Sequence, residues 1–471
     1  MKDHTDKTFI LVALVVFVLL LLHFLPPLSL GDTKLRQVNI LSDLSDAPSD
    51  GEEEGIIPLA KVPVQTPQSA SADSINDTFR DIKWPKGVEP IDDYSAGAAN
   101  GMEHFYTMLD SLTKKAAVGR PVRIAYYGDS FIEGDILTEY LREMLQAKYG
   151  GYGIGWLDAG NGLNQYKQTI DTHSSGLTEC MAMKQQGYNA QKAGIAERYY
   201  PFSGGASMTF RSRSVPAQEK DAKGQPLQEF PHVQKWQSAR AYFVAQTPVS
   251  LSLSATGGQS ASPHFDAADG VQMAETTQWM NNLSVSVLSG SGSLFGVALE
   301  TDNGIVVDNF SMRGSSGITL SALSPKMLAD FNRVRPYDLI IFQFGTNAIT
   351  ANTGQKHLTW YMEQMQKVIT LYKKCFPETS ILVMSTPDRG ARTAQGLGTM
   401  KNIEALVSYQ QQLAADNHVA FYNLFRAMGG TGSMAKLCEQ GMGSKDFVHI
   451  NHKAGKLIAR HIFNSFSAAV P

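Results

Sequence analysis

Ser130 is the residue of this chain best placed to act as a nucleophile. It ends a Gly-Asp-Ser sequence that directly follows Val122–Tyr126, a mostly apolar run that predicts a short buried strand. Apolar residues at helical spacing then cover Asp135–Lys148. A serine between a strand's carboxyl end and a helix's amino end projects from the sheet edge, where backbone N–H groups and the helix dipole stabilise negative charge. The tripeptide alone is equally typical of a helix cap, so the residues downstream decide between the two interpretations.

Four further apolar runs predict strands of the same sheet, at Gly304–Phe310, Asp338–Phe344, Ser380–Ser385 and Val419–Tyr422. Short apolar strands that alternate with helical stretches are typical of a doubly wound parallel sheet. The helical stretches cover about 94–117, 357–376, 400–417 and 454–468. The first of these precedes the strand before Ser130, and we expect it to pack beside that strand.

Polar or glycine-rich residues follow these strands where each one ends, and ligands bind at that edge of such a sheet. Gly314 follows the second strand and Asn347 the third, while Asp446 and His449 lie in the long loop after the fifth. Because the carboxyl ends of parallel strands meet at one edge, we expect these side chains to lie close to Ser130.

The motifs Gly128-Asp129-Ser130, Gly314, Gly345-Thr346-Asn347 and Asp446-x-x-His449 together resemble the four signature blocks of the SGNH (GDSL-type) hydrolases, in chain order and in position. Gly-Thr-Asn in place of the commoner Gly-x-Asn-Asp resembles the peptidoglycan O-acetylesterase branch of that superfamily. The resemblance covers about 121–156 and 294–468. It implies a three-layer, doubly wound α/β fold and a serine esterase activity.

The roles that the resemblance implies also make chemical sense. Ser130 would attack an acyl carbonyl, His449 would take its proton, and Asp446 would fix the imidazole tautomer. The backbone N–H groups of Ser130 and Gly314 and the side-chain amide of Asn347 would hold the oxyanion, each donor contributing about 3–4 kcal/mol. There is no Gly-x-Ser-x-Gly sequence around Ser130, so the α/β-hydrolase fold fits less well.

Other interpretations exist for several neighbouring residues. His452 lies one turn from His449 but has no acid three residues earlier, so we favour His449 as the base. Asp129 is expected to hold the turn rather than to act as a second acid. Asp388 and Arg389, after the fourth strand, either line the cleft or form a surface ion pair. No His, Cys or carboxylate cluster has metal-ligand spacing, so neither a metal nor another cofactor is predicted.

Residues 161–293 are rich in Ser, Gly, Gln and Thr and contain several runs of alternating polarity, which predict strands with one polar face. We interpret this segment as an inserted β-sandwich-like domain and a candidate for binding glycan, with both of its connections near the active-site edge. The hydrolase domain then comprises 82–160 and 294–471. Aromatic residues of the insertion either fill its core or stack on sugars, namely Tyr199, Tyr200, Trp236, Tyr242 and Trp279.

The N-terminus predicts membrane attachment. Lys2 and Lys7 precede Phe9–Leu25, an apolar run near the lower limit for crossing a bilayer. Residues 1–30 are therefore expected to be a signal anchor, with a cleaved signal peptide as the alternative. Residues 31–81, rich in Ser, Asp, Glu, Pro and Gln, would be a disordered linker. The enzyme would then be periplasmic or extracytoplasmic, tethered to the inner membrane.

The resulting hypothesis is a serine esterase that removes O-acetyl groups from a cell-envelope glycan, most of all peptidoglycan. An O-acetyltransferase that uses the same acyl-enzyme is a close alternative, and a lipid esterase or thioesterase is another. A non-catalytic glycan-binding envelope protein is the alternative outside enzymes, although it would not need Ser130, Asp446 and His449 together. The net charge of −3 and the lack of a basic stripe argue against nucleic acid as a partner.

Overall fold

Ser130 lies at the carboxyl edge of a six-stranded sheet with the strand order β18-β4-β19-β20-β23-β3. The strands are β3 (Ile91–Asp93), β4 (Val122–Gly128), β18 (Ile305–Ser311), β19 (Leu339–Gln343), β20 (Ser380–Met384) and β23 (Ala420–Tyr422). Five of them are parallel, as predicted, and β3 pairs antiparallel with β23 at the edge.

The computed structural model describes residues 29–30, 33–34, 58–59, 80–116, 118–160, 162–184, 186–220, 224, 226–393 and 396–470. The predicted membrane anchor lies outside these residues, and the predicted linker lies almost wholly outside them. Within the described part of the chain, no helix is long and apolar enough to cross a bilayer. Residues 55–471 form one compact unit, and a separate unit over 1–54 contains a strand pair, β1 (Ser29–Leu30) with β2 (Thr33–Lys34).

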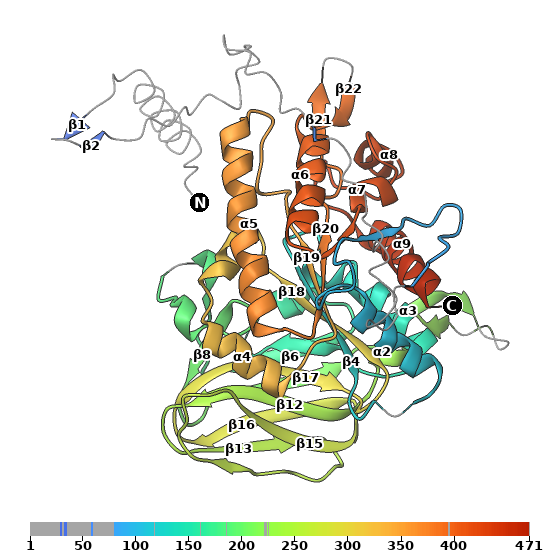
Figure 1. Ribbon diagram of the computed structural model, residues 1–471. Coiled ribbons are helices and arrows are strands. Elements are labelled where there is room, and N and C mark those ends of the chain that lie inside the picture. The colour runs from blue at the N-terminus through green and yellow to red at the C-terminus, as the bar shows by residue number, and fades with distance from the viewer. Residues whose placement is uncertain are drawn as a thin grey trace, which may run out of the picture. The chain divides into compact units, whose positions relative to one another are not determined.

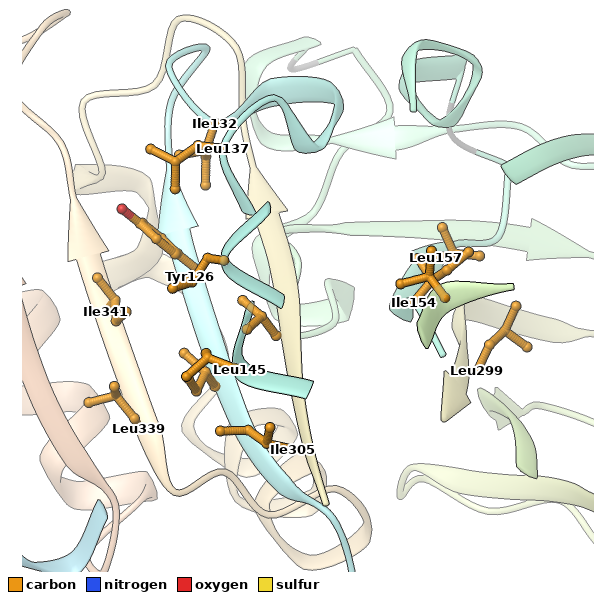
Figure 2. Close-up of a cluster of buried hydrophobic side chains, with 14 of the residues drawn as sticks. Tyr126, Ile132, Leu137, Leu145, Ile154, Leu157, Leu299, Ile305, Leu339 and Ile341 are labelled. Carbon is orange, nitrogen blue, oxygen red and sulfur yellow. The ribbon is translucent and has the colours of Figure 1, made fainter. Parts of the chain in front are cut away.

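Helices cover both faces of the parallel sheet because its strands are apolar on both faces. Along β4, Ile124 and Tyr126 face one buried cluster while Ala125 and Tyr127 face the other. The first cluster contains α2 (Glu103–Thr113), α3 (Thr138–Tyr149) and α9 (His452–Ala469), and Figure 2 shows part of it around Tyr126. The second contains α4 (Pro325–Val334), α5 (Gln355–Cys375) and α6 (Ile403–Asp416). The three-layer arrangement is visible in Figure 1.

Two of the predicted helices are shorter than expected at their amino ends. α2 begins at Glu103, because Ala96, Gly97 and Asn100 have positive φ angles that a helix does not tolerate. α3 begins at Thr138, after a 3₁₀ turn (η1, Glu133–Asp135) in which Gly134 and Asp135 both have φ near +63°. The start of α3 therefore lies eight residues beyond Ser130, and its dipole contributes little there, because the effect fades within one turn.

A second β-rich region consists of two antiparallel sheets. One contains β5 (Gly155–Asp158), β7 (Cys180–Met181), β8 (Arg198–Phe202), β12 (Trp236–Ala245), β15 (Gln272–Met280) and β17 (Gly292–Glu300). The other contains β6 (Ile170–Ser175), β9 (Ser207–Ser212), β13 (Val249–Ser254), β14 (His264–Phe265) and β16 (Asn282–Ser289). Residues of both sheets share one buried cluster, and the rings of Phe243 and Phe265 meet at 5.0 Å, so the two sheets form a sandwich.

The first sheet of the sandwich is covered on its other face by the α/β part. Tyr242 of β12 and Phe295 of β17 contact Phe331 of α4, with ring centroids 6.1 and 5.3 Å apart. β5 lies before residue 161, and the part of β17 that pairs with it lies after residue 293. The β-rich region therefore extends beyond the predicted insertion, 161–293, at both ends. The β-rich region thus shares an apolar core with the α/β part of the chain.

The chain leaves and re-enters the α/β part at the amino edge of the parallel sheet, which corrects the expectation that both connections lie at the active-site edge. The carbonyl of Gly150, directly after α3, accepts from the N–H of Ile305 at the beginning of β18. After β17 it passes Gly304, whose carbonyl accepts from the N–H of Val122 at the beginning of β4. This return follows from the topology, because β18 is parallel to β4 and must be entered at its amino end.

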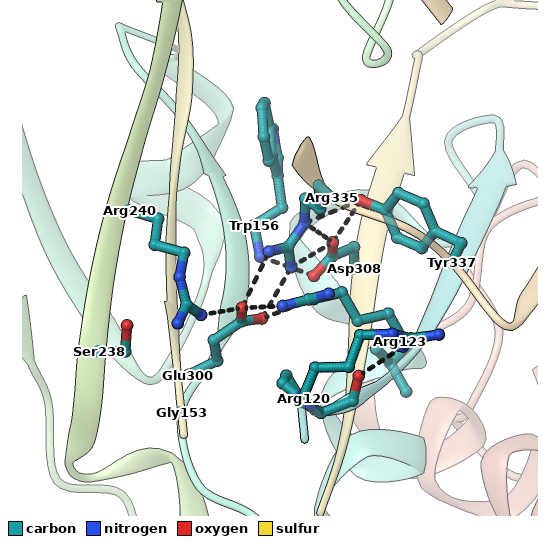
Figure 3. A network of polar contacts seen from close by, with 12 residues as sticks. Arg120, Arg123, Gly153, Trp156, Ser238, Arg240, Glu300, Asp308, Arg335 and Tyr337 are labelled. Carbon is teal, nitrogen blue, oxygen red and sulfur yellow. Dashed lines mark hydrogen bonds and ion pairs between the residues drawn. The ribbon is translucent and has the colours of Figure 1, made fainter. Parts of the chain in front are cut away.

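Buried charges also join the sandwich to the α/β part. Glu300, at the end of β17, accepts hydrogen bonds from Arg123 of β4, Arg240 of β12 and Arg335 after α4 (Figure 3). Arg335 also pairs with Asp308 of β18 at 2.7 Å. Burial alone would raise the pKa of Glu300, but Arg123 and Arg335 lower it far below its ordinary value. Glu300 therefore remains a carboxylate inside the protein.

The remaining elements are short. They include the hairpin β21 (Gly390–Thr393) with β22 (Gly396–Thr399), the pair β10 (Pro216–Lys220) with β11 (Pro226–Gln228), and the helices α7 (Leu424–Ala427) and α8 (Ser433–Glu439).

Candidate active site

The structure brings Ser130, His449 and Asp446 together, although 319 residues separate the first two. His449 Nε2 lies 2.8 Å from Ser130 Oγ, and His449 Nδ1 lies 2.6 Å from Asp446 Oδ2. With Nδ1 protonated and bonded to the carboxylate, Nε2 can accept the serine proton. This is the hydrogen-bond order required of a nucleophile, a general base and an orienting acid.

The Asp446 carboxylate is held by its own loop. Its Oδ1 accepts the backbone N–H groups of Val448 and His449, at 3.0 and 3.1 Å. Partial burial raises the pKa of Asp446, but the hydrogen bonds from the His449 side chain and from these N–H groups lower it overall. Asp446 is therefore ionised at neutral pH and can stabilise an imidazolium at His449.

A tight turn positions His449. Phe447 has a φ of +60°, which is uncommon for a bulky residue, and its carbonyl accepts from the N–H of Gly390 at 2.8 Å. A side chain at Gly390 would place its Cβ 2.8 Å from Phe447 Cβ. The β21–β22 hairpin thus touches the catalytic loop through a position where only glycine leaves enough space.

Asp129 holds the turn before Ser130, as expected. Its Oδ1 accepts the N–H of Phe131 at 2.9 Å, and its Oδ2 accepts from Asn347 Nδ2 at 3.1 Å. Burial raises its pKa to about 6, although hydrogen bonds and His449 act in the opposite direction. Asp129 therefore fixes the turn and also positions Asn347.

Backbone N–H groups of Ser130 and Gly314 are available to an oxyanion. Gly314 has a φ of +76°, so glycine is favoured there. In the described part of the chain, no hydrogen-bond acceptor engages either N–H. Both N–H groups are therefore left without a protein acceptor, just beyond the carboxyl ends of β4 and β18.

Asn347 lies beside these groups, but both of its amide hydrogens have acceptors. Nδ2 donates to Asp129 Oδ2 and to the carbonyl of Ser315, at 3.1 Å in each case. An amide nitrogen carries two hydrogens, so donation to an oxyanion requires one of these bonds to be exchanged or shared. Asn347 is correctly placed for the predicted role and would move slightly to perform it.

Three residues near the site form hydrogen bonds with other parts of the fold: His452, Asp388 and Arg389. His452 Nδ1 contacts Gln168 Nε2 at 2.8 Å, at the start of α9. Asp388 is buried and accepts from Thr399 and from the N–H of Met434, so it fastens β22 to α8. Arg389 donates to the carbonyls of Thr346 and Ile349 and secures the loop of Asn347. Neither Asp388 nor Arg389 forms the surface ion pair that was one of the two interpretations.

Two features of the site were not predicted from the sequence. Met183, from the inserted segment, lies beside Gly314, since a Cβ built at Gly314 would meet its terminal methyl at 3.6 Å. Arg313 forms an exposed ion pair with Glu133, three residues after Ser130. No sequence pattern indicates either contact, because both join segments that are far apart in the chain.

No metal site accompanies this constellation. In the ranges that the structure describes, no three His, Cys, Asp or Glu side chains are grouped as metal ligands would be.

Comparison with solved structures shows which known protein has a similar fold. A structure described as "Peptidoglycan O-acetylesterase in action, 5 min" matches 81% of this chain and 99% of its own, with 19% sequence identity and a TM-score of 0.63. The chain therefore has the fold of that protein, which agrees with the α/β fold that the four motifs led us to expect. No family model and no curated protein sequence matches.

Two further structures show weaker similarity. A family two carbohydrate esterase from Cellvibrio japonicus covers 64% of this chain and 98% of its own, with 10% identity and a TM-score of 0.25. A family 29 carbohydrate-binding module covers 32% of this chain and 92% of its own, with 8% identity and a TM-score of 0.20. Their TM-scores are too low to support an argument about this chain.

Proposed function

We propose that this protein is a serine esterase that removes O-acetyl groups from a carbohydrate through an acyl-enzyme on Ser130. The observation that carries the proposal is the continuous hydrogen-bonded set of Ser130, His449 and Asp446 beside two unoccupied N–H donors. His449 takes the serine proton as Oγ attacks the acetyl carbonyl, and the N–H groups of Ser130 and Gly314 stabilise the oxyanion. His449 then returns the proton to the sugar oxygen as it leaves.

Deacylation follows the same route with water as the nucleophile. The side chains of His449 and Asp446 are 35% and 50% exposed. Water therefore reaches the imidazole freely, which favours hydrolysis over transfer to a second sugar, because transfer requires water to be excluded.

Peptidoglycan is the substrate that we propose first. Its support is the resemblance of Gly345-Thr346-Asn347 to one branch of the superfamily, together with the fold shared with a peptidoglycan O-acetylesterase. We further propose, from the sequence alone, that the apolar run at Phe9–Leu25 tethers the enzyme to a membrane, with its catalytic part outside the cytoplasm.

Acetate release tests the activity. Purified protein is incubated with O-acetylated peptidoglycan, acetylated xylan and a long-chain p-nitrophenyl ester, and the Ser130→Ala variant is the control. We expect acetate from peptidoglycan at the highest kcat/KM and little cleavage of the long-chain ester. Equal rates for wild type and Ser130→Ala would refute the mechanism, and preference for xylan would refute the substrate.

A further inference from the structure

A polar pocket of about 210 Å³ lies in the inserted segment, between the 3₁₀ turn η2 (Gly162–Tyr166) and strand β6. Its walls include Gly160, Asn164, Gln165, Thr172, His173 and Ser174. β6 is the edge strand of its sheet, paired with β9 on one side. Its other side presents backbone N–H and C=O groups in addition to these side chains.

The chemistry of this pocket suits an uncharged, hydroxyl-rich ligand. The walls contain amides, hydroxyls and an imidazole, and none of the residues that form them is Asp, Glu, Lys or Arg. Such groups both donate and accept hydrogen bonds, as sugar hydroxyl and acetamido groups do. The volume is below the range of roughly 300–1,000 Å³ that drug-sized ligands occupy, so a single sugar ring is the appropriate size.

A short series of contacts joins this pocket to Ser130. The N–H of Glu133 donates to the carbonyl of Ser130 at 3.3 Å. At the next residue, a Cβ on Gly134 would lie 3.1 Å from Tyr166 Cβ, so the missing side chain lets η2 pack closely on η1. The turn η2, which forms one wall of the pocket, therefore packs against the segment that follows Ser130.

Tyr166 extends this path toward the oxyanion donors. Its side chain is 61% exposed, and it contacts Gly134, whose neighbour Glu133 pairs with Arg313. Arg313 immediately precedes Gly314. An exposed aromatic ring next to Gln165 of the pocket wall offers an apolar face on which a pyranose ring can stack.

We propose that this pocket, together with Tyr166, is a second sugar subsite that binds a neutral N-acetylhexosamine ring of the glycan while an acetylated neighbour reacts at Ser130. The proposal rests on the proposed function for the identity of the reacting sugar. Binding of the neutral ring itself requires no chemistry at Ser130, so the two can be tested separately.

Calorimetric titration of full-length Ser130→Ala protein with the trimer of N-acetylglucosamine tests the subsite. We expect a Kd on the order of 1 mM. Adding Gln165→Ala, Tyr166→Ala or His173→Ala should weaken binding at least about tenfold, a loss of roughly 1.4 kcal/mol. These side chains are exposed, and circular dichroism and the melting temperature verify that each variant is folded.

Trp279→Ala is the matched control, because Trp279 is an exposed aromatic of the same sandwich, 53% accessible at the end of β15. It should leave the Kd unchanged. Undetectable binding of the trimer at about 20 mM, or loss of binding in Trp279→Ala with none in the three pocket variants, overturns the subsite. If the pocket variants lose binding but wild type releases no acetate, the proposed function fails and the subsite stands.

Discussion

In the proposed mechanism, attack by Ser130 requires His449 as the base, so the two residues should act as a unit. We expect Ser130→Ala and His449→Ala each to lower kcat by several orders of magnitude, and the double variant to lose little more. His452→Ala is the matched control, since His452 bonds to Gln168 instead of Ser130. Steady-state hydrolysis of p-nitrophenyl acetate measures all four proteins. A larger loss in His452→Ala than in His449→Ala would contradict the assignment of the base.

Asn347 should affect the transition state more than substrate binding. Asn347→Ala removes an amide beside the oxyanion donors, and we expect kcat to fall about 10²–10³-fold with a smaller change in KM. Asn352→Ala, on an exposed turn of the same loop, is the comparison. A rise in KM with kcat unchanged would show that Asn347 contributes only uniform binding.

Asp129 predicts a pH dependence of stability. Its folded-state pKa is raised from 3.8 to about 6 by burial, so the folded protein holds a proton that the unfolded chain has already released. The free energy of unfolding should therefore fall as pH rises from about 4 to 6, by about 3 kcal/mol from this group. Urea unfolding of wild type and Asp129→Asn at several pH values measures the difference. Parallel pH profiles would contradict it.

At the scale of elements, the β21–β22 hairpin positions the catalytic loop. Gly390→Ala would place a methyl group 2.8 Å from Phe447 Cβ and displace the turn that holds His449. We expect kcat to fall about tenfold, because small misplacements of a catalytic group are costly. Gly204→Ala is the control, since its Cβ would meet only ordinary contacts at 3.6 Å. Unchanged kcat in Gly390→Ala would show that the loop does not depend on the hairpin.

The elements also decide which aromatics of the insertion can reach a glycan. Four of the five aromatics are buried, which agrees with the interpretation that they fill the core of the sandwich: Tyr199, Tyr200, Trp236 and Tyr242. The fifth, Trp279, is exposed. Tyr166, which the sequence did not single out, is exposed and packs against Gly134, four residues after Ser130.

At the scale of the whole molecule, the sandwich and the α/β part should unfold together. Glu300 is fully buried among Arg123, Arg240 and Arg335 (Figure 3). Glu300→Gln leaves these cations without their central anion and should lower the free energy of unfolding by about 3–5 kcal/mol.

The control for this prediction is Asp302→Asn. Asp302 is 44% exposed and pairs with Arg240 at the rim, so its loss should cost less than about 1 kcal/mol. Chemical denaturation followed by tryptophan fluorescence measures both variants. Two separate unfolding transitions in wild type would mean that the parts are independent. Replacing 161–293 by a linker would remove β12, the strand that pairs with β17, and with it Arg240. Because such a deletion would disturb the fold itself, point variants are the better test of the insertion.

The sequence by itself predicted the parallel sheet and the residues that the structure brings together at the candidate site. Five apolar strands, each followed by a polar cluster, place Ser130, Gly314 and Asn347 at one edge, because parallel strands end on the same side. His449 and Asp446 were identifiable because an acid three residues before a histidine can bond to its ring within one loop.

Only the tertiary structure decided what surrounds these residues. Met183 contacts Gly314, and Arg389 donates to the carbonyl of Thr346 in the 345–347 loop. The Asn347 amide donates to the Asp129 carboxylate and the Ser315 carbonyl. Each of these contacts joins segments that are far apart in the chain. Side-chain contacts of this kind depend on packing, and no local propensity or periodicity encodes them. The late start of α3 likewise depends on the left-handed residues Gly134 and Asp135, and the missing side chain at Gly134 lets η2 pack against η1.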